Sequence, residues 1–201
     1  MSRAGKKKNI EKKKTVICIS GMAGTGKSTL AKKLAKKYGL KYYSGGDALK
    51  ALAAEEVSNA SNNGWWESPE GLAFLRQREK DPQFDKAVDD KLLEYARQGD
   101  VLLDSWTMPW LLKTGFKIWL LASIEKRAER VAQRDKLTVK DALQILKEKE
   151  ARTKAIYQKL YGFTLGEDFA PFNLVLDTDN LDAEEVFQVL CKVLDSVVLK
   201  N

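Results

Sequence analysis

The octet GMAGTGKS, residues 21–28, constrains the fold of this chain more than any other stretch. It matches the pattern G-x-x-x-x-G-K-[ST] in full, in which glycines let the backbone curl so that successive N–H groups point at a phosphate. A continuous apolar, β-branched run precedes it at residues 15–20, and apolar side chains recur at helical spacing over residues 27–38. This order of strand, glycine loop and helix predicts a phosphate-binding loop, or P-loop.

Individual roles follow from the chemistry of such a loop. Lys27 is expected to reach the β- and γ-phosphate oxygens of a nucleotide, and Ser28 to supply a hydroxyl to Mg²⁺. The N-terminus of the following helix adds the positive end of its dipole. The other expected nucleotide contacts are Gly21, Gly24, Thr25, Gly26 and Thr29.

Short apolar runs alternate with helical segments along the rest of the chain. Further strands are expected at residues 40–43, 101–103, 116–121 and 174–176, and helices at 47–60, 86–98, 124–161 and 183–199, with another helix start at Ser68-Pro69-Glu70. Strands that alternate with helices form a parallel sheet covered on both faces. We therefore predict a three-layer α/β/α fold with a five-stranded parallel sheet.

Asp104 directly follows the third predicted strand. Ligand sites in open α/β sheets lie at the carboxyl ends of strands, so this carboxylate is expected near the P-loop. There it would hold Mg²⁺ together with Ser28, whereas its alternative role is to cap the strand end. The chain has no histidine and no cysteine pair at ligand spacing, which argues against a transition-metal site.

The formal net charge of +7 is concentrated at the N-terminus. Residues 1–14 carry Glu11 and seven basic residues: Arg3, Lys6, Lys7, Lys8, Lys12, Lys13 and Lys14. Such a block of like charge with little apolar surface predicts a disordered tail, with contact to RNA or to a membrane surface as the alternative. The remainder, residues 15–201, is nearly neutral and is predicted to be one domain.

No apolar run has the length of a transmembrane helix or the form of a secretory signal. Cys18 lies in a predicted strand and Cys191 in a predicted helix, so both are expected to be buried free thiols. These features together predict a cytoplasmic protein.

Arginines cluster in the charged helical region. Arg127, Arg130 and Arg134 recur at three- and four-residue spacing and share one helical face. If the phosphate acceptor is itself a phosphate, the reaction needs positive charge to hold two anions together, and arginine supplies it bidentately. We interpret this face, with Arg152, as part of a closing lid; a solvated helix face is the alternative.

A hydroxyl acceptor would make a different demand. A carboxylate base would then help to remove the hydroxyl proton, and Asp47 or Asp104 are the candidates. The acceptor class stays open between these two chemistries.

With these features the chain resembles the P-loop nucleoside monophosphate kinases, and most closely the archaeal-type cytidylate kinases. The similar stretches are GMAGTGKSTLAKKLAKKYGLKYYSGGDALKALA, DPQFDKAVDDKLLEYARQGDVLLD, FKIWLLASIEKRAERVAQRD and YGFTLGEDFAPFNLVLDTDN. The resemblance implies a kinase domain at 15–201 with an acceptor-binding region at 47–85, a lid at 123–161 and an adenine site near 177–180. It also implies Mg²⁺-dependent transfer of the ATP γ-phosphoryl group to CMP or dCMP.

The chain departs from the family pattern where the acceptor or the lid would act. Lys50 stands in place of an arginine, Ser105-Trp106 in place of a Gly-Arg pair, and Ile156-Tyr157 in place of an Arg-Tyr pair. Residues 59–77, which include Trp65-Trp66, match poorly. The predicted acceptor contacts are Asp47, Lys50, Trp106 and Arg152. Tryptophans at 65, 66, 106 and 110 are candidates for a stacking surface, with packing in the core as the alternative for each of them.

Three functions remain open from the sequence. The leading one is a kinase for CMP or dCMP; the others are a kinase for a hydroxyl-bearing small molecule or nucleoside, and an RNA-associated P-loop ATPase that uses the basic tail. Nucleotides are the expected partners in each case, and the oligomeric state is not predicted.

Overall fold

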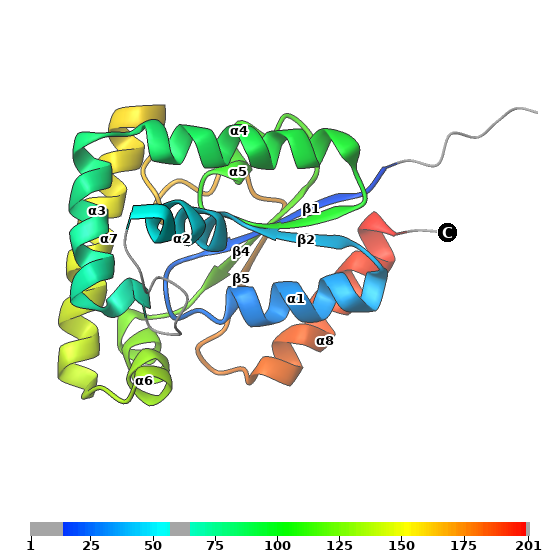
Figure 1. Cartoon of the computed structure of the whole chain (residues 1–201). Helices are drawn as coiled ribbons and strands as arrows, with labels where there is room; N and C mark the ends of the chain where they lie inside the picture. The colour runs from blue at the N-terminus through cyan, green and yellow to red at the C-terminus, as the bar shows by residue number, and fades with distance from the viewer. Residues whose placement is uncertain (1–13, 57–64, 200–201) are drawn as a thin grey trace, which may run out of the picture.

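The computed structural model describes residues 14–56 and 65–199. Its sheet has five parallel strands in the order β2-β3-β1-β4-β5 (Figure 1). The strands are β1 (Val16–Gly21), β2 (Lys41–Ser44), β3 (Val101–Asp104), β4 (Phe116–Leu121) and β5 (Leu174–Asp177). All five strands expected from the sequence are confirmed, with bounds that differ by at most one residue.

Helices cover both faces of this sheet, as Figure 1 shows. One core cluster joins alternate residues of β1, such as Ile17, to α1 (Lys27–Tyr38) and α8 (Ala183–Val193). A second cluster joins Cys18 and Leu103 to α2 (Gly45–Glu56), α4 (Gln83–Gln98) and α5 (Met108–Leu111). Because successive strand residues point to opposite faces, these clusters lie on opposite sides of the sheet. The predicted three-layer α/β/α fold is therefore confirmed.

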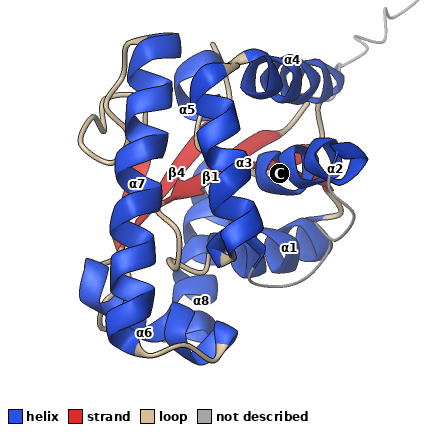
Figure 2. Cartoon of the chain, turned by 60° about the vertical axis from the view of Figure 1, so that its left-hand side comes forward, coloured by secondary structure: helices blue, strands red, loops and turns tan. Residues whose placement is uncertain are grey.

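The charged region predicted as helical is two helices, α6 (Ile124–Asp135) and α7 (Val139–Tyr161). The chain turns at Lys136, which has a φ of 58°, and the Thr138 side chain then caps α7 by accepting from the Asp141 N–H at 3.1 Å. Helix α3 (Pro69–Lys80) lies beside α7 at one end of the sheet (Figure 2). The expected start of α3 is confirmed, because Ser68 accepts a hydrogen bond from the Gly71 N–H at 3.2 Å.

Several expectations fall wholly or partly outside the described residues. The basic tail does so up to residue 13, so both disorder and RNA contact stay predictions. The helix expected at 47–60 is described as α2 only as far as Glu56. Cys18 and Cys191 are buried and free, as expected. Among the helices at 14–56 and 65–199, none has the length and apolar character needed to cross a bilayer.

Candidate active site

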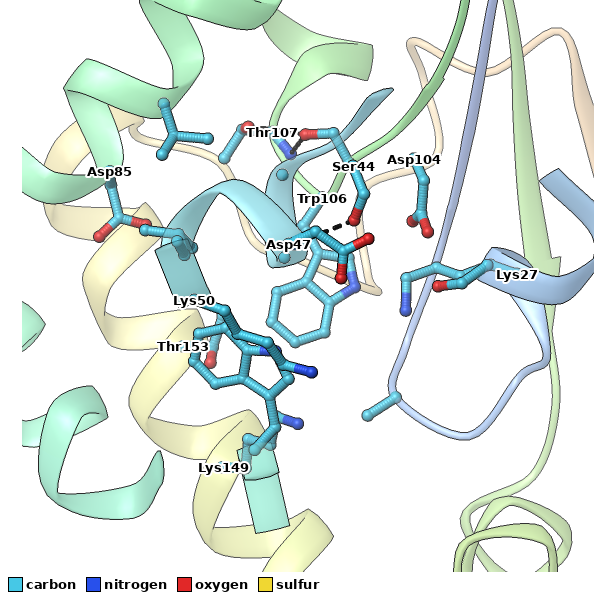
Figure 3. A pocket seen from close by; sticks show the side chains of 18 of the residues that line it. Lys27, Ser44, Asp47, Lys50, Asp85, Asp104, Trp106, Thr107, Lys149 and Thr153 are labelled. Carbon is cyan, nitrogen blue, oxygen red and sulfur yellow. Dashed lines mark hydrogen bonds between the residues drawn. The ribbon is translucent and has the colours of Figure 1, made fainter. Parts of the chain in front are cut away.

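A cavity of about 420 Å³ opens at the carboxyl ends of β2 and β3. The P-loop and the start of α1 contribute Gly24, Lys27, Ser28 and Thr29 to its wall. Other parts of the wall come from the start of α2, the segment after β3, and helices α3, α4 and α7 (Figure 3). Of the predicted nucleotide contacts, Gly21, Thr25 and Gly26 shape the loop without lining the cavity, and the Thr25 hydroxyl donates to the Met22 carbonyl at 2.9 Å.

Gly24 shows why the loop needs glycine. Its φ is +85°, and a Cβ atom there would lie 2.9 Å from the carbonyl oxygen of Arg127. Both the left-handed backbone and the lack of space exclude a larger residue. The absence of a side chain thus lets α6 pack directly on the P-loop.

Asp104 occupies the position expected from its place in the sequence. It ends β3 beside β1, is 3 % exposed, and accepts a hydrogen bond from the Tyr42 hydroxyl at 3.2 Å. Burial, reinforced by the Asp104 charge, raises the pKa of Tyr42, so this hydroxyl stays protonated as a donor. Asp104 and Lys27 project toward the same space in Figure 3. A carboxylate and the Ser28 hydroxyl are oxygen ligands of the kind that Mg²⁺ prefers, so the residues present fit this ion.

Trp106 connects the segment after β3 to the P-loop. Its indole N–H donates to the Gly21 carbonyl at 2.6 Å, and the Lys27 ammonium lies 5.4 Å from the ring centroid. The ring also lines the cavity. Trp106 therefore packs against the P-loop and Lys27 and helps to hold them in place. The predicted contact of Trp106 with the acceptor stays a prediction.

A second helix N-terminus faces the same cavity. The α2 helix follows β2 at once, and the Ser44 hydroxyl accepts from the Asp47 N–H at 3.1 Å (Figure 3). Gly45 and Gly46 bring the helix backbone to the cavity wall, together with Asp47 and Lys50. Unpaired N–H groups and the dipole at such an end favour an anion.

The arginines predicted to belong to a lid contact different parts of the structure. Arg134 lines the cavity. Arg130 donates to the Thr178 carbonyl at 2.8 Å, within the expected adenine segment, and Arg152 pairs with Glu79 and Glu148. Within the part of the chain that the structure describes, Arg130 and Arg152 do not line the cavity, so their predicted contacts with phosphate stay predictions.

Arg127 is placed differently from a lid residue that faces phosphate. It is 5 % exposed, and its guanidinium donates to the carbonyls of Ala122 and Ala23 at 3.1 Å each. It also forms an ion pair with Glu150 of α7. The close approach of α6 to Gly24 places this side chain beside the P-loop, where it links the residue after β4, the loop and α7.

The far wall of the cavity holds residues that the sequence analysis did not single out. Arg78 of α3 and Asp85 of α4 form an ion pair with both side chains 2 % exposed, and the Arg78 Nε donates to Asp85 at 3.0 Å. Arg78 also donates to the Tyr157 hydroxyl of α7 at 3.3 Å. No sequence signal could have found this pair, because the packing of α3, α4 and α7 sets which side chains meet.

Asp89 is a buried carboxylate in the same wall. The hydroxyls of Thr107 and Tyr161 donate to it, the latter at 2.6 Å. Burial raises the pKa of Asp89 to about 6, although these two hydrogen bonds lower it. The charged form is therefore costly near neutral pH.

The tryptophans divide between the core and the cavity. Trp65 is 4 % exposed and packs in the core against Phe74, whereas its neighbour Trp66 lines the cavity. Trp110 stacks on Phe163 at a centroid distance of 3.9 Å, away from the cavity wall. Of these four tryptophans, only Trp66 and Trp106 line the cavity and can form a stacking surface for a ligand.

Comparison with protein families agrees with this geometry. Residues 16–180 match the model of the cytidylate kinase-like family. The chain belongs to the cytidylate kinase-like family. It is 33 % identical over 185 residues to a cytidylate kinase of Pyrococcus horikoshii. The match covers 92 % of this chain and 90 % of the Pyrococcus protein. A cytidylate kinase of Ignicoccus hospitalis is 34 % identical to this chain over 185 residues. The match covers 90 % of this chain and 99 % of the Ignicoccus protein.

Solved structures support the same fold. A shikimate kinase from Bacteroides thetaiotaomicron superposes with a TM-score of 0.54 at 17 % identity, covering 90 % of this chain and 98 % of the other. This likeness shows the P-loop kinase fold alone. Family membership confirms the resemblance to archaeal-type cytidylate kinases and the class of the enzyme, an ATP-dependent phosphotransferase.

The first prediction concerns Arg127. Replacing it with leucine leaves Glu150 without its cation in a largely buried place, which should lower the free energy of unfolding by about 3–5 kcal/mol. The double variant Arg127→Leu, Glu150→Leu should recover much of this loss. Urea unfolding measures both, and equal losses in the single and double variants would contradict the role assigned to the pair.

The second prediction concerns Asp89. The folded state binds more protons than the unfolded chain between about pH 4 and pH 6, because the pKa of this carboxyl is raised. Its contribution to the free energy of unfolding therefore falls as pH rises through that window. The free energy of unfolding of Asp89→Asn, taken relative to that of the wild type at the same pH, should rise by about 2 kcal/mol between pH 4 and pH 7. The exposed neighbour Asp90→Asn is the control, and a difference independent of pH would refute the assignment.

Proposed function

We propose that this chain transfers the γ-phosphoryl group of ATP to a nucleoside monophosphate, with CMP or dCMP as the acceptor. One observation carries the proposal: the N-termini of α1 and α2 open on the same cavity. Each end favours an anion, so the site is built for two phosphorylated ligands. The cytidylate kinases among the relatives support the choice of cytosine nucleotides.

The charge of the wall favours the same conclusion. Among the described residues, the cationic side chains that line the cavity are Lys27, Lys32, Lys50, Arg78, Arg134 and Lys149, against the carboxylates of Asp47, Asp85, Asp89 and Asp104. A phosphate acceptor already carries its nucleophilic oxygen as an anion, so the reaction needs charge neutralisation and alignment more than a base. Lys27 and Lys50, which both line the cavity, meet that need.

Each residue has a role in this proposal. The P-loop amides and Lys27 would hold the donor phosphates, and Lys50 with the α2 N-terminus would hold the acceptor phosphate. Ser28 and Asp104 would hold Mg²⁺, which neutralises phosphate charge when bound. Arg134 would approach the transferring group from the lid.

A hydroxyl acceptor is the second candidate, and the positions of two carboxylates favour it. Asp47 and Asp104 both line the cavity near Lys27, where one could accept a proton from an alcohol (Figure 3). This candidate predicts ADP formation with cytidine or another alcohol, and loss of that activity when both residues become asparagine. Unchanged activity of the double variant on a hydroxyl compound would eliminate it.

The third prediction tests the phosphoryl-transfer site. Lys27→Ala should lower turnover of ATP with CMP at least about a hundredfold, because the transition-state charge loses its preorganised cation. Lys36→Ala, on the exposed side of the same helix, is the matched control and should keep wild-type turnover. Coupled detection of ADP, with chromatographic identification of the second product, measures both variants. Wild-type turnover in Lys27→Ala would refute the assignment.

A further inference from the structure

The middle of α7 carries a buried hydroxyl without a hydrogen-bond partner. Thr153 is 1 % exposed, and its Oγ1 has no partner among the described residues. Threonine within a helix commonly bonds back to the carbonyl of the preceding turn, but this one does not. Thr153 instead lines the cavity. A buried polar atom without a partner needs a reason, and a bound ligand can supply one.

The position of Thr153 indicates which part of a ligand it would meet. Figure 3 places Thr153 and Asp85 on the side of the cavity away from Lys27 and Asp104. In the proposed function the phosphates lie at the end formed by the P-loop and the α2 N-terminus, so the base of the acceptor nucleotide would extend toward Thr153.

The surroundings of Thr153 suit a flat group with polar edges. Trp66, Leu75 and Val88 supply apolar wall, and the Arg78–Asp85 pair supplies a donor beside an acceptor. The hydrogen bonds of Arg78 to described residues use Nε and Nη2, which leaves Nη1 as a further donor. A nucleobase presents this combination of apolar faces and polar edges.

We propose that Thr153 determines acceptor specificity by hydrogen-bonding the base of the nucleoside monophosphate, in a subsite completed by Trp66 and the Arg78–Asp85 pair. This inference rests on the proposed function. It gives α7 a role that Arg152 does not reveal: this helix forms part of the wall against which the acceptor base lies. The hydroxyl is then satisfied only in the complex.

The fourth prediction follows from that difference between free and bound protein. Thr153→Val keeps the shape of the side chain and removes only the hydroxyl, so the free protein should melt at the wild-type temperature or above. Loss of one neutral hydrogen bond should raise KM and Kd for CMP about three- to tenfold, with kcat unchanged, because the contact is equal in the ground and transition states. Thr153→Ser should restore both constants toward the wild type.

A control variant and a comparison of CMP with dCMP test whether the Thr153 hydroxyl contacts the base. Ser20→Ala removes another buried hydroxyl without a partner, on β1 and outside the cavity wall, and should leave KM for CMP unchanged. The base contact predicts equal losses for CMP and dCMP, whereas a loss confined to CMP would assign the hydroxyl to the ribose 2′-OH and overturn the inference. Unchanged KM and Kd in Thr153→Val would also overturn it.

The wild-type protein separates failure of the inference from failure of the proposed function. If it phosphorylates CMP and Thr153→Val behaves identically, only the inference falls. If it phosphorylates no nucleoside monophosphate, both fall. A lower melting temperature together with a lower kcat in Thr153→Val, not rescued by serine, would show a structural role and contradict the assignment.

Discussion

The cavity depends on the contact between Arg127 and the P-loop. Gly24 has no side chain, so the backbone of α6 packs against the loop, and the Arg127 guanidinium then reaches the carbonyls of Ala23 and Ala122. Its ion pair with Glu150 extends the link to α7. One buried cation thereby holds the P-loop, the residue after β4 and α7 together. Because α7 forms part of the far wall of the cavity, this link also fixes the position of that wall.

The same arrangement concentrates positive potential where the proposed reaction brings two anions together. Parallel strands end at one edge of the sheet, and α1 and α2 both begin there. The dipoles of both helices and the lysines at 27 and 50 act on the same cavity, where electrostatic interactions are stronger than in bulk solvent. Phosphoryl transfer between two phosphates makes this electrostatic demand, so the fold and the proposed reaction fit each other.

The sequence predicted the parts whose geometry is local. The octet at 21–28 with its flanking strand and helix was sufficient to place Lys27 and Ser28, and the rule for strand ends placed Asp104. Ser68 and Pro69 marked the start of α3 because capping acts within one turn. Family resemblance added the class of enzyme, which the family match confirms.

Contacts between distant elements could not be predicted in this way. Helical spacing put Arg127, Arg130 and Arg134 on one face, but three long side chains on one face can reach three different partners. The Arg78–Asp85 pair and the unpartnered hydroxyl of Thr153 arise from how α3, α4 and α7 meet. Adjacent Trp65 and Trp66 differ because the first is buried in the core and the second lines the cavity. These features depend on packing, which no short motif encodes.

The most direct test of the account is the identity of the phosphorylated product when the wild-type chain acts on ATP and Mg²⁺ with CMP or cytidine as the acceptor. A site built for two phosphate-bearing ligands predicts CDP from CMP and a much smaller rate with cytidine. CMP formation from cytidine, with no CDP from CMP, would contradict the account and assign the cavity to a hydroxyl acceptor.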